Sequence, residues 1–450
     1  MTDHECEGGR GKQWAWRGVA LLWAVSAVGA ACARAPRAQE PSVSTVARAS
    51  AAPAVRLGIT VLLEDSLQLI AGKRIALLTN QTGVDATGTS DVELLQHDPR
   101  AVSAGVTLVR LFSPEHGIRG TADRPDLPDE LDRRSGLMVH SLYTTESVPP
   151  PDSLLRDLDA LVFDLQDIGT RTWTYVGVMV YAMRAAARAG IPFIVLDRPN
   201  PLGGRAEAPL LDSALANPLD PTPTLRGQAY ALYPAPLRHG MTMGELARLF
   251  AGELAIPVRL HVVPAAGWRR DLWWEETGLP WVVPSPAMVS TTSALLYPAL
   301  VAFERSNLSV GRGTELPFQQ LGAPWLDADS LTALLQSRDL AGVRFESAYF
   351  KPSAPTDGKF GNLLVPGVRV VVVDRERLQV GRLGATLLWA VARVAPDSLR
   401  ITERGWDLRF GDSAARVALM GDADPDEVVD RMQPALAAWQ QRMRRYLIYR

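Results

Sequence analysis

The sequence predicts an α/β protein in which a mostly parallel sheet precedes a smaller α+β region. Two observations lead to this prediction. From Arg74 onward, short strand-like runs alternate with helix-like segments, which is typical of a parallel sheet. The strand-like runs are also apolar almost throughout, as expected for strands that are covered on both faces. Beyond about residue 257 this alternation stops and Pro and Trp become frequent, so a second region begins there.

Four apolar runs are predicted to form the strands of the parallel sheet. Each run is short, contains β-branched or aromatic residues and ends in turn formers, which favours a strand over a helix. The predicted strands are 75–79, 107–112, 160–165 and 192–197.

Three helices are predicted around these strands from the signals at their ends. The predicted helices are 90–96, 175–189 and 242–250. Ser90 or Asp91 caps the first helix through its side chain. Gly190 ends the second helix, because glycine adopts the left-handed conformation that follows many helices. Thr242 and Glu245 have the spacing of a capping box at the start of the third helix.

The second region is predicted to contain two strands and two closing helices. The strands are expected at 343–348 and 367–374, and the helices at 383–394 and 434–447. Pro434 lies in the first turn of the last helix, where a missing N–H group costs nothing.

The N-terminal segment is predicted to lie outside the fold. Basic residues precede an apolar stretch at 19–31 that ends in small residues, which is the layout of a secretory signal. We therefore expect a periplasmic or extracellular protein. Cys32 follows this stretch, so lipidation of Cys32, with membrane attachment, and simple cleavage at an Ala-x-Ala site are both open. The predicted organisation is a signal at 1–32, a disordered linker at 33–54, a parallel-sheet domain at 55–260 and a second domain at 261–450.

Composition excludes some partners. The net charge is −2 and no basic stripe occurs, so nucleic acid is not an expected partner. Cys6 and Cys32 are the only cysteines, and both precede the fold, so no internal disulfide is expected.

Charged residues beside Gly or Pro occur in five segments, mostly just after apolar runs. Ligands bind at the carboxyl ends of the strands of open α/β sheets, so we expect these segments to converge on one cleft. The five segments contain Glu115, His116 and Arg119; Asp164, Asp167 and Arg171; Asp197, Arg198 and Asn200; Arg238 and His239; and Asn307 with Arg312.

Glu115 is the strongest catalytic candidate among them. It directly follows the strand 107–112 and lies between Phe112 and Ile118, so the strand delivers a partly desolvated carboxyl group to the sheet edge. A carboxyl group in such surroundings can act as a general acid. The alternative interpretation is a helix cap or a surface ion pair with Arg119.

Asp164 and Asp167 are the candidates for a second carboxyl group. On an extended chain they point to opposite faces, so one is expected to face the site while the other anchors a helix or an arginine. A metal site is not expected, because His116 and His239 are isolated and no HExxH or paired-cysteine motif occurs. No nucleophile elbow, Walker loop or GxGxxG turn is present either, so no organic cofactor is expected.

Four tryptophans of the second region have two possible roles. Their rings can stack on sugar rings, but buried tryptophans more often belong to a core or an interface. The four are Trp268, Trp273, Trp274 and Trp281.

Taken together, the motifs resemble the NamZ-type exo-β-N-acetylmuramidases, a family of glycoside hydrolases. The resemblance runs from about residue 55 to the end of the chain. The matching stretches are Leu78–Gly83, Leu111–Gly117, Asp164–Gly169 with Arg171 and Tyr175, Leu196–Pro201, Arg238–Thr242, Pro284–Pro286, Asn307–Ser309 with Gly311–Thr314, and Tyr446–Tyr449. It implies a Rossmann-like catalytic domain, with a smaller C-terminal domain that forms the other wall of the cleft.

The activity that the resemblance implies is removal of terminal N-acetylmuramic acid from the non-reducing end of peptidoglycan fragments, as in cell-wall recycling. The catalytic glutamate of the family matches Glu115. Three loops depart from the family pattern and leave the substrate preference less defined than the reaction. They are Ala287–Val289, Glu304–Ser306 and Asn362–Pro366.

A mechanism follows as a hypothesis. Glu115 protonates the leaving oxygen, and Asp164 or Asp167 assists the attack, unless the N-acetyl group of the substrate does so itself. The lactyl carboxylate of the substrate calls for a guanidinium group, with Arg171 or Arg312 favoured over Arg198 and Arg238. The further substrate-binding candidates are His116, Tyr175, Asp197, Asn200, His239 and Asn307.

Two alternative functions stay open. A secreted or lipid-anchored glycan-binding protein would bind saccharides without turnover. A metal-dependent hydrolase that used Asp164, Asp167, His116 and His239 would lose its activity in EDTA.

Overall fold

The computed structural model describes residues 55–122, 126–142, 144, 148–216 and 230–450, and every structural statement below concerns these residues. The predicted signal segment and linker lie outside them. The described chain from residue 55 belongs to one compact unit, Ala51–Arg450. The domain boundary predicted at 260 stays a prediction. Among the described residues, no helix is both long and apolar enough to cross a membrane.

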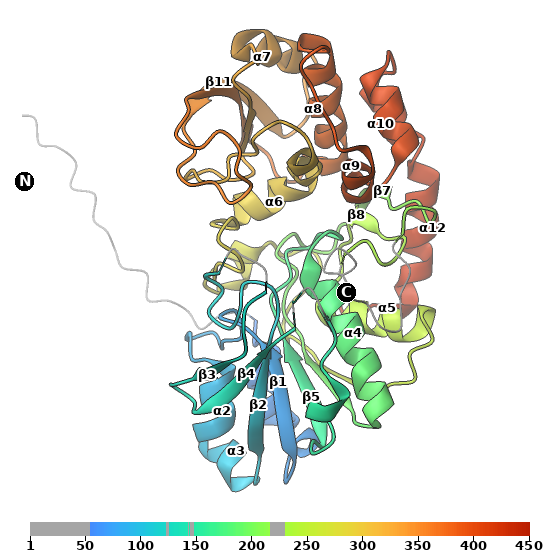
Figure 1. The fold of residues 1–450 in the computed structure, drawn as a ribbon. Helices are drawn as coiled ribbons and strands as arrows, with labels where there is room; N and C mark the ends of the chain where they lie inside the picture. The colour runs from blue at the N-terminus through green and yellow to red at the C-terminus, as the bar shows by residue number, and fades with distance from the viewer. Residues whose placement is uncertain (1–54, 123–125, 143, 145–147, 217–229) are drawn as a thin grey trace, which may run out of the picture. The chain divides into compact units, whose positions relative to one another are not determined.

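A seven-stranded sheet forms the centre of the first region (Figure 1). Every neighbouring pair in it is parallel except β3 and β4, so the predicted mostly parallel sheet is confirmed. The order across the sheet is β3 (Glu130–Asp132), β4 (Leu137–Ser141), β2 (Thr107–Ser113), β1 (Arg74–Thr79), β5 (Ala160–Asp164), β6 (Phe193–Leu196) and β9 (Leu260–Val263).

The four central strands are those that the sequence predicted, within one residue at most ends. The sequence analysis missed β3, β4 and β9. These strands lie at the two edges of the sheet and keep exposed or half-buried residues, so they lack the continuous apolar pattern of a central strand.

Successive residues of each central strand belong to two different cores. Ile75 and Leu77 pack in one core, whereas Ala76 and Leu78 pack in the other. The first core contains residues of α1 (Gly58–Asp65), α2 (Asp91–His97) and α3 (Pro99–Ser103), and the second contains those of α4 (Thr174–Ala189) and α5 (Met243–Glu253). Helices on both faces explain why the strands are apolar throughout.

The predicted helix signals are confirmed. Ser90 Oγ accepts a hydrogen bond from the Glu93 N–H group at the start of α2. Gly190 ends α4 with a φ of 70°. Thr242 and Glu245 form both hydrogen bonds of a capping box at the start of α5.

The second region contains an antiparallel sheet of three strands. Their order is β10 (Gln320–Gly322), β12 (Val365–Val372) and β11 (Val343–Phe350). Earlier in the sequence, β7 (Glu207–Leu210) and β8 (Pro236–Arg238) form a separate antiparallel pair. The helices are α6 (Thr291–Leu300), α7 (Ala328–Gln336), α8 (Val380–Val394), α9 (Glu403–Phe410), α10 (Ser413–Met420), α11 (Pro425–Asp430) and α12 (Gln433–Met443). The prediction of a smaller second α+β region is therefore confirmed.

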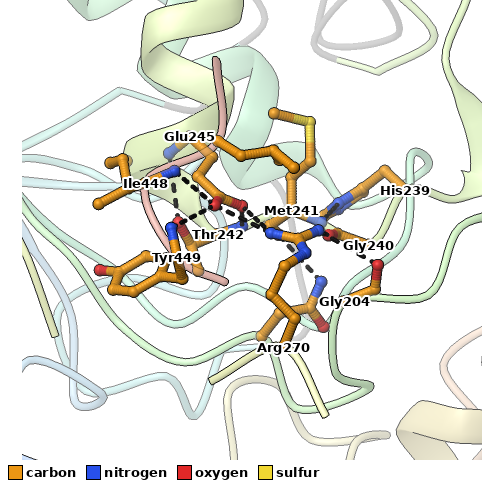
Figure 2. A network of polar contacts seen from close by, with 12 residues as sticks. Gly204, His239, Gly240, Met241, Thr242, Glu245, Arg270, Ile448 and Tyr449 are labelled. Atoms are coloured by element: carbon orange, nitrogen blue, oxygen red, sulfur yellow. Dashed lines mark hydrogen bonds and ion pairs between the residues drawn. The ribbon is translucent and has the colours of Figure 1, made fainter. Parts of the chain in front are cut away.

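The last predicted helix is too long by four residues. Helix α12 ends at Met443, and the chain beyond it binds to the parallel-sheet region. The carboxylate of Glu245 accepts hydrogen bonds from the N–H groups of Ile448 (2.9 Å) and Tyr449 (3.3 Å), as Figure 2 shows. Arg270 donates to both oxygens of the same carboxylate at 2.9 Å. The C-terminal residues thus complete the first region of the fold.

The side chain of Tyr449 reaches further into this region. Its hydroxyl group donates to Asp197 Oδ2 at 2.6 Å and accepts the Ala265 N–H group at 2.8 Å. Asp197 is fully buried and also accepts hydrogen bonds from Thr242 Oγ1 and the Gly244 N–H group. Burial raises the pKa of Asp197 to about 7, although these donors lower it.

Candidate active site

Glu115 lies on the turn that follows β2. Its side chain is half-buried, and its Oε2 accepts a hydrogen bond of 2.8 Å from Thr174 Oγ1. Thr174 is the first residue of α4, the helix that follows β5. In the sheet, β1 lies between β5 and the strand β2 that precedes Glu115. His116, the next residue, has a φ of 72°, and its Nδ1 lies 2.8 Å from the Ala122 carbonyl oxygen. The turn therefore holds the carboxyl group in one place.

The residue after Thr174, Tyr175, joins two other segments of the chain through its hydroxyl group. Tyr175 is fully buried, and its hydroxyl group donates to the Pro284 carbonyl oxygen at 2.9 Å. The same hydroxyl group accepts a hydrogen bond of 2.9 Å from Asn80 Nδ2, which follows β1. Burial, and next the carboxyl group of Glu115, raise the pKa of Tyr175 well above its usual range. Tyr175 is therefore a neutral support of the site.

Arg312 comes from the second region. Its Nε donates to Glu304 Oε1 at 2.7 Å, and its guanidinium carbon lies 5.2 Å from the centre of the Phe318 ring. Its side chain keeps 19% of its surface exposed.

The other three predicted arginines lie in the interior. Arg171 donates to the carbonyl oxygens of residues 408–410 at the end of α9. Arg198 forms a two-point ion pair with Asp164, and Arg238 donates to Glu207 Oε1 at 2.7 Å. These contacts join loops and helices, so the structure gives these three residues structural partners. Their predicted contact with a substrate stays a prediction.

The two candidate second carboxyl groups are also buried. Asp164 is 0% exposed, and its pairing with Arg198 matches the expectation that one aspartate anchors an arginine. Asp167 is 3% exposed. Its Oδ2 accepts the Gly169 N–H group at 2.6 Å and lies 3.1 Å from His239 Nε2.

Asn200, His239 and Asn307 contact the backbone. Asn200 binds the N–H group of Leu202 and the carbonyl oxygen of Met241. His239 Nδ1 accepts the Met241 N–H group at 3.1 Å, so the remaining ring proton lies on Nε2, toward Asp167. Asn307 clamps the chain on both sides of residue 399, through Ser398 and Arg400.

The tryptophans belong to the core, as the second interpretation proposed. Trp268, Trp273 and Trp274 are between 3% and 7% exposed. Trp268 packs edge-on against Tyr449, and Trp274 against Trp281. Among the described residues, no group of three or more His, Cys, Asp or Glu side chains is placed to hold a metal ion.

A cavity of about 220 Å³ lies beside the Glu115 turn, at the end of β1. Its charged lining residues pair with one another, Arg119 with Asp132 and Arg134 with Glu93. Glu115 does not line it.

Sequence reasoning missed several residues of the site. Thr174 contacts Glu115 directly, but a threonine at the start of a helix has no sequence signal beyond that of the helix end. Trp173 packs edge-on against both Tyr175 and Tyr297, at 5.3 Å and 5.9 Å between ring centres. The sequence contained no sign that Tyr297, from α6, would join this group, because the contact spans more than one hundred residues.

Comparisons with known proteins show the family of this chain. Residues 75–292 match the family model described as "Exo-beta-N-acetylmuramidase NamZ, N-terminal", and residues 295–449 match its C-terminal counterpart. The chain is 37% identical over 400 residues to the peptidoglycan beta-N-acetylmuramidase NamZ of Bacillus subtilis, covering 88% of this chain and 92% of that protein.

Two solved structures from Bacteroides fragilis, both of DUF1343 family proteins, share the fold. One has a TM-score of 0.76 at 32% identity, and the other a TM-score of 0.70 at 25% identity. Each comparison covers 88% of this chain and 99% of the other.

Proposed function

The chain belongs to the family of NamZ exo-β-N-acetylmuramidases, and from this we propose that it releases terminal β-N-acetylmuramic acid from the non-reducing end of peptidoglycan fragments. It is a glycoside hydrolase by its family and by its relative over most of the chain. The contact between Glu115 and Thr174 is the observation that supports a catalytic role for Glu115.

We propose that Glu115 is the general acid. Thr174 holds Oε2, so the glycosidic oxygen would meet Oε1. A general acid must lie within hydrogen-bond reach of the leaving oxygen, and the contact with Thr174 supports such a positioned role for Glu115. The resemblance of Leu111–Gly117 to the family motif also supports this role for Glu115.

We further propose that the acetamido group of the substrate takes the place of a protein nucleophile. Most glycosidases use two carboxyl groups, but substrate-assisted enzymes use the N-acetyl group of the sugar. Asp164 pairs with Arg198, and Asp167 contacts Gly169 and His239, so both carboxyl groups have partners inside the fold. This arrangement supports a mechanism in which neither attacks the sugar.

The test compares Glu115→Gln with Glu130→Gln, a matched change at an exposed position. Two substrates are used: 4-nitrophenyl β-N-acetylmuraminide and a disaccharide in which N-acetylmuramic acid is linked to N-acetylglucosamine. Nitrophenol leaves without protonation, whereas a sugar alcohol needs an acid. Glu115→Gln should therefore lower kcat about 100- to 10,000-fold on the disaccharide and much less on the nitrophenyl substrate.

The outcomes separate the alternatives. Equal losses on both substrates would show that Glu115 is not the general acid. Loss of wild-type activity in EDTA, with recovery on adding divalent ions, would favour a metal-dependent hydrolase. Saccharide binding without turnover would favour a glycan-binding protein.

We also propose that the protein acts outside the cytoplasm, because residues 19–31 have the layout of a secretory signal. Mass spectrometry of the mature N-terminus distinguishes a lipidated Cys32 from simple cleavage. A chain that keeps residues 1–32 in cells would contradict the proposal.

A further inference from the structure

Arg312 belongs to a cluster of charged side chains that we call the Glu304 cluster. Its members are Glu304, Arg312, Lys359 and Arg409. Arg312 binds Glu304 at 2.7 Å, and Arg409 Nε lies 3.8 Å from the other oxygen of the same carboxylate. Each of the four side chains keeps between 11% and 19% of its surface exposed, so a ligand from solvent can reach the cluster.

The Glu304 cluster has more positive than negative charge. Lys359 donates to the carbonyl oxygens of Glu304 and Leu308, and its Nζ lies 3.9 Å from Asp357. Three cations therefore stand beside two carboxylates. Burial alone would raise the pKa of Glu304, but Arg312 and Arg409 outweigh it and hold the pKa below its ordinary value. The surplus of positive charge suits an anionic ligand.

A row of aromatic rings joins this cluster to the proposed acid. The ring of Tyr297 lies 5.9 Å from Trp173 and 4.7 Å from Phe318, above which Arg312 is placed. Trp173 immediately precedes Thr174, the residue that binds Glu115. One continuous row of packed side chains thus links the guanidinium group of Arg312 to the residue that binds the carboxyl group of Glu115.

The backbone fixes the ring beneath Arg312. Phe318 has a φ of 60°, a left-handed conformation that is unfavourable for a residue with a side chain. Its ring is 0% exposed, and packing against Tyr297 holds it there. The position of the guanidinium group is therefore set by buried groups.

We propose that Arg312 binds a carboxylate of the saccharide and thereby determines the preference for an acidic sugar. This inference rests on the proposed function, in which the released sugar is N-acetylmuramic acid. That sugar differs from N-acetylglucosamine by a lactyl ether, which carries the carboxylate. A guanidinium group matches a carboxylate with two parallel hydrogen bonds. Arg171, Arg198 and Arg238 are each at most 5% exposed and bind groups inside the fold. Of the four candidate arginines, Arg312 is therefore the one most accessible to a carboxylate of the substrate.

The experiment uses Arg312→Gln, Arg312→Lys and the control Arg305→Gln, which removes an exposed charge next to Glu304 in the sequence. The substrates are the nitrophenyl β-glycosides of N-acetylmuramic acid, of its lactyl methyl ester and of N-acetylglucosamine. For Arg312→Gln we expect kcat/KM on the acidic sugar to fall about 100-fold. The ester and N-acetylglucosamine substrates should change less than threefold, and Arg312→Lys should recover part of the loss. Arg305→Gln should behave as the wild type.

Two results would overturn the inference. One is an equal loss on all three substrates, which would make Arg312 a structural residue. The other is an unchanged preference for the acidic sugar. If the wild type cleaves none of the substrates, the proposed function fails. Calorimetric binding of free N-acetylmuramic acid and its methyl ester to wild type and Arg312→Gln then decides the inference by itself.

Discussion

Replacing Tyr449 with Phe removes one oxygen atom from the interior, and the loss of its two hydrogen bonds lowers the free energy of unfolding. The hydroxyl group donates to Asp197 Oδ2 at 2.6 Å and accepts the Ala265 N–H group at 2.8 Å. A hydrogen bond to a charged group contributes about 1.5–3 kcal/mol, and an unsatisfied buried N–H group costs about 1–3 kcal/mol. We expect Tyr449→Phe to lower the free energy of unfolding by about 3 kcal/mol at pH 8.

The cost should depend on pH. The pKa of Asp197 is about 7 in the fold, above its ordinary value of 3.8. The stability that Asp197 contributes is thus complete below pH 3.8 and is lost as the pH rises through 7. Tyr449 lowers this pKa by its hydrogen bond, so its removal raises the pKa further. The difference between wild type and Tyr449→Phe should therefore widen from pH 6 to pH 8.

Urea unfolding at both pH values measures the effect. Tyr446→Phe is the control, because its hydroxyl group binds the partly exposed Glu253 at 2.7 Å and should contribute about 1 kcal/mol or less. A cost of Tyr449→Phe below about 0.5 kcal/mol at pH 8, or an equal cost at both pH values, would refute the reasoning.

Two further predictions concern the hydrogen bond of Glu115 and the buried aspartates Asp91 and Asp164. Thr174→Val should lower kcat about 10- to 100-fold with little change in KM, because it removes the hydrogen bond that orients the Glu115 carboxyl group. Thr174→Ser should keep most of the activity in the same steady-state assay. Asp91 is buried, and burial and then Asp164 raise its pKa well above 3.8, so its stabilising contribution is lost as the pH rises. Asp91→Asn should therefore flatten the decline in unfolding free energy between pH 5 and pH 9, and a pH slope equal to that of the wild type would contradict this. Asp164→Asn removes the ion pair of Asp164 with Arg198, so it should lower the free energy of unfolding by about 3–5 kcal/mol.

The sequence predicted the centre of the fold well because its signals are local. The apolar run 160–165 and the capping box of Thr242 and Glu245 need only neighbouring residues to act, and both are confirmed. The edge strand Glu130–Asp132 escaped prediction because strand pairing, rather than its own composition, gives it structure.

Site residues were harder to rank because the same residue types serve substrate and scaffold. Arg198, Arg238 and Arg312 all lie near Gly or Pro in the sequence. Only the fold brings Asp164 to Arg198 across 34 positions and Glu207 to Arg238 across 31. Distant ion pairs of this kind cannot be inferred from spacing, so the choice among the arginines needed the structure.

The attachment of the C-terminus to the first region sets the order in which the protein is completed. A growing chain on the ribosome produces Asp197 and Glu245 first, and the donors from Ile448 and Tyr449 follow 203 residues after Glu245 and 252 residues after Asp197. Domains generally fold in the order of their synthesis. Here the region that contains Asp197 and Glu245 lacks these hydrogen bonds until residues 448 and 449 have been synthesised. A tag fused after Arg450 would be joined directly to this segment, so it would have to leave these hydrogen bonds intact.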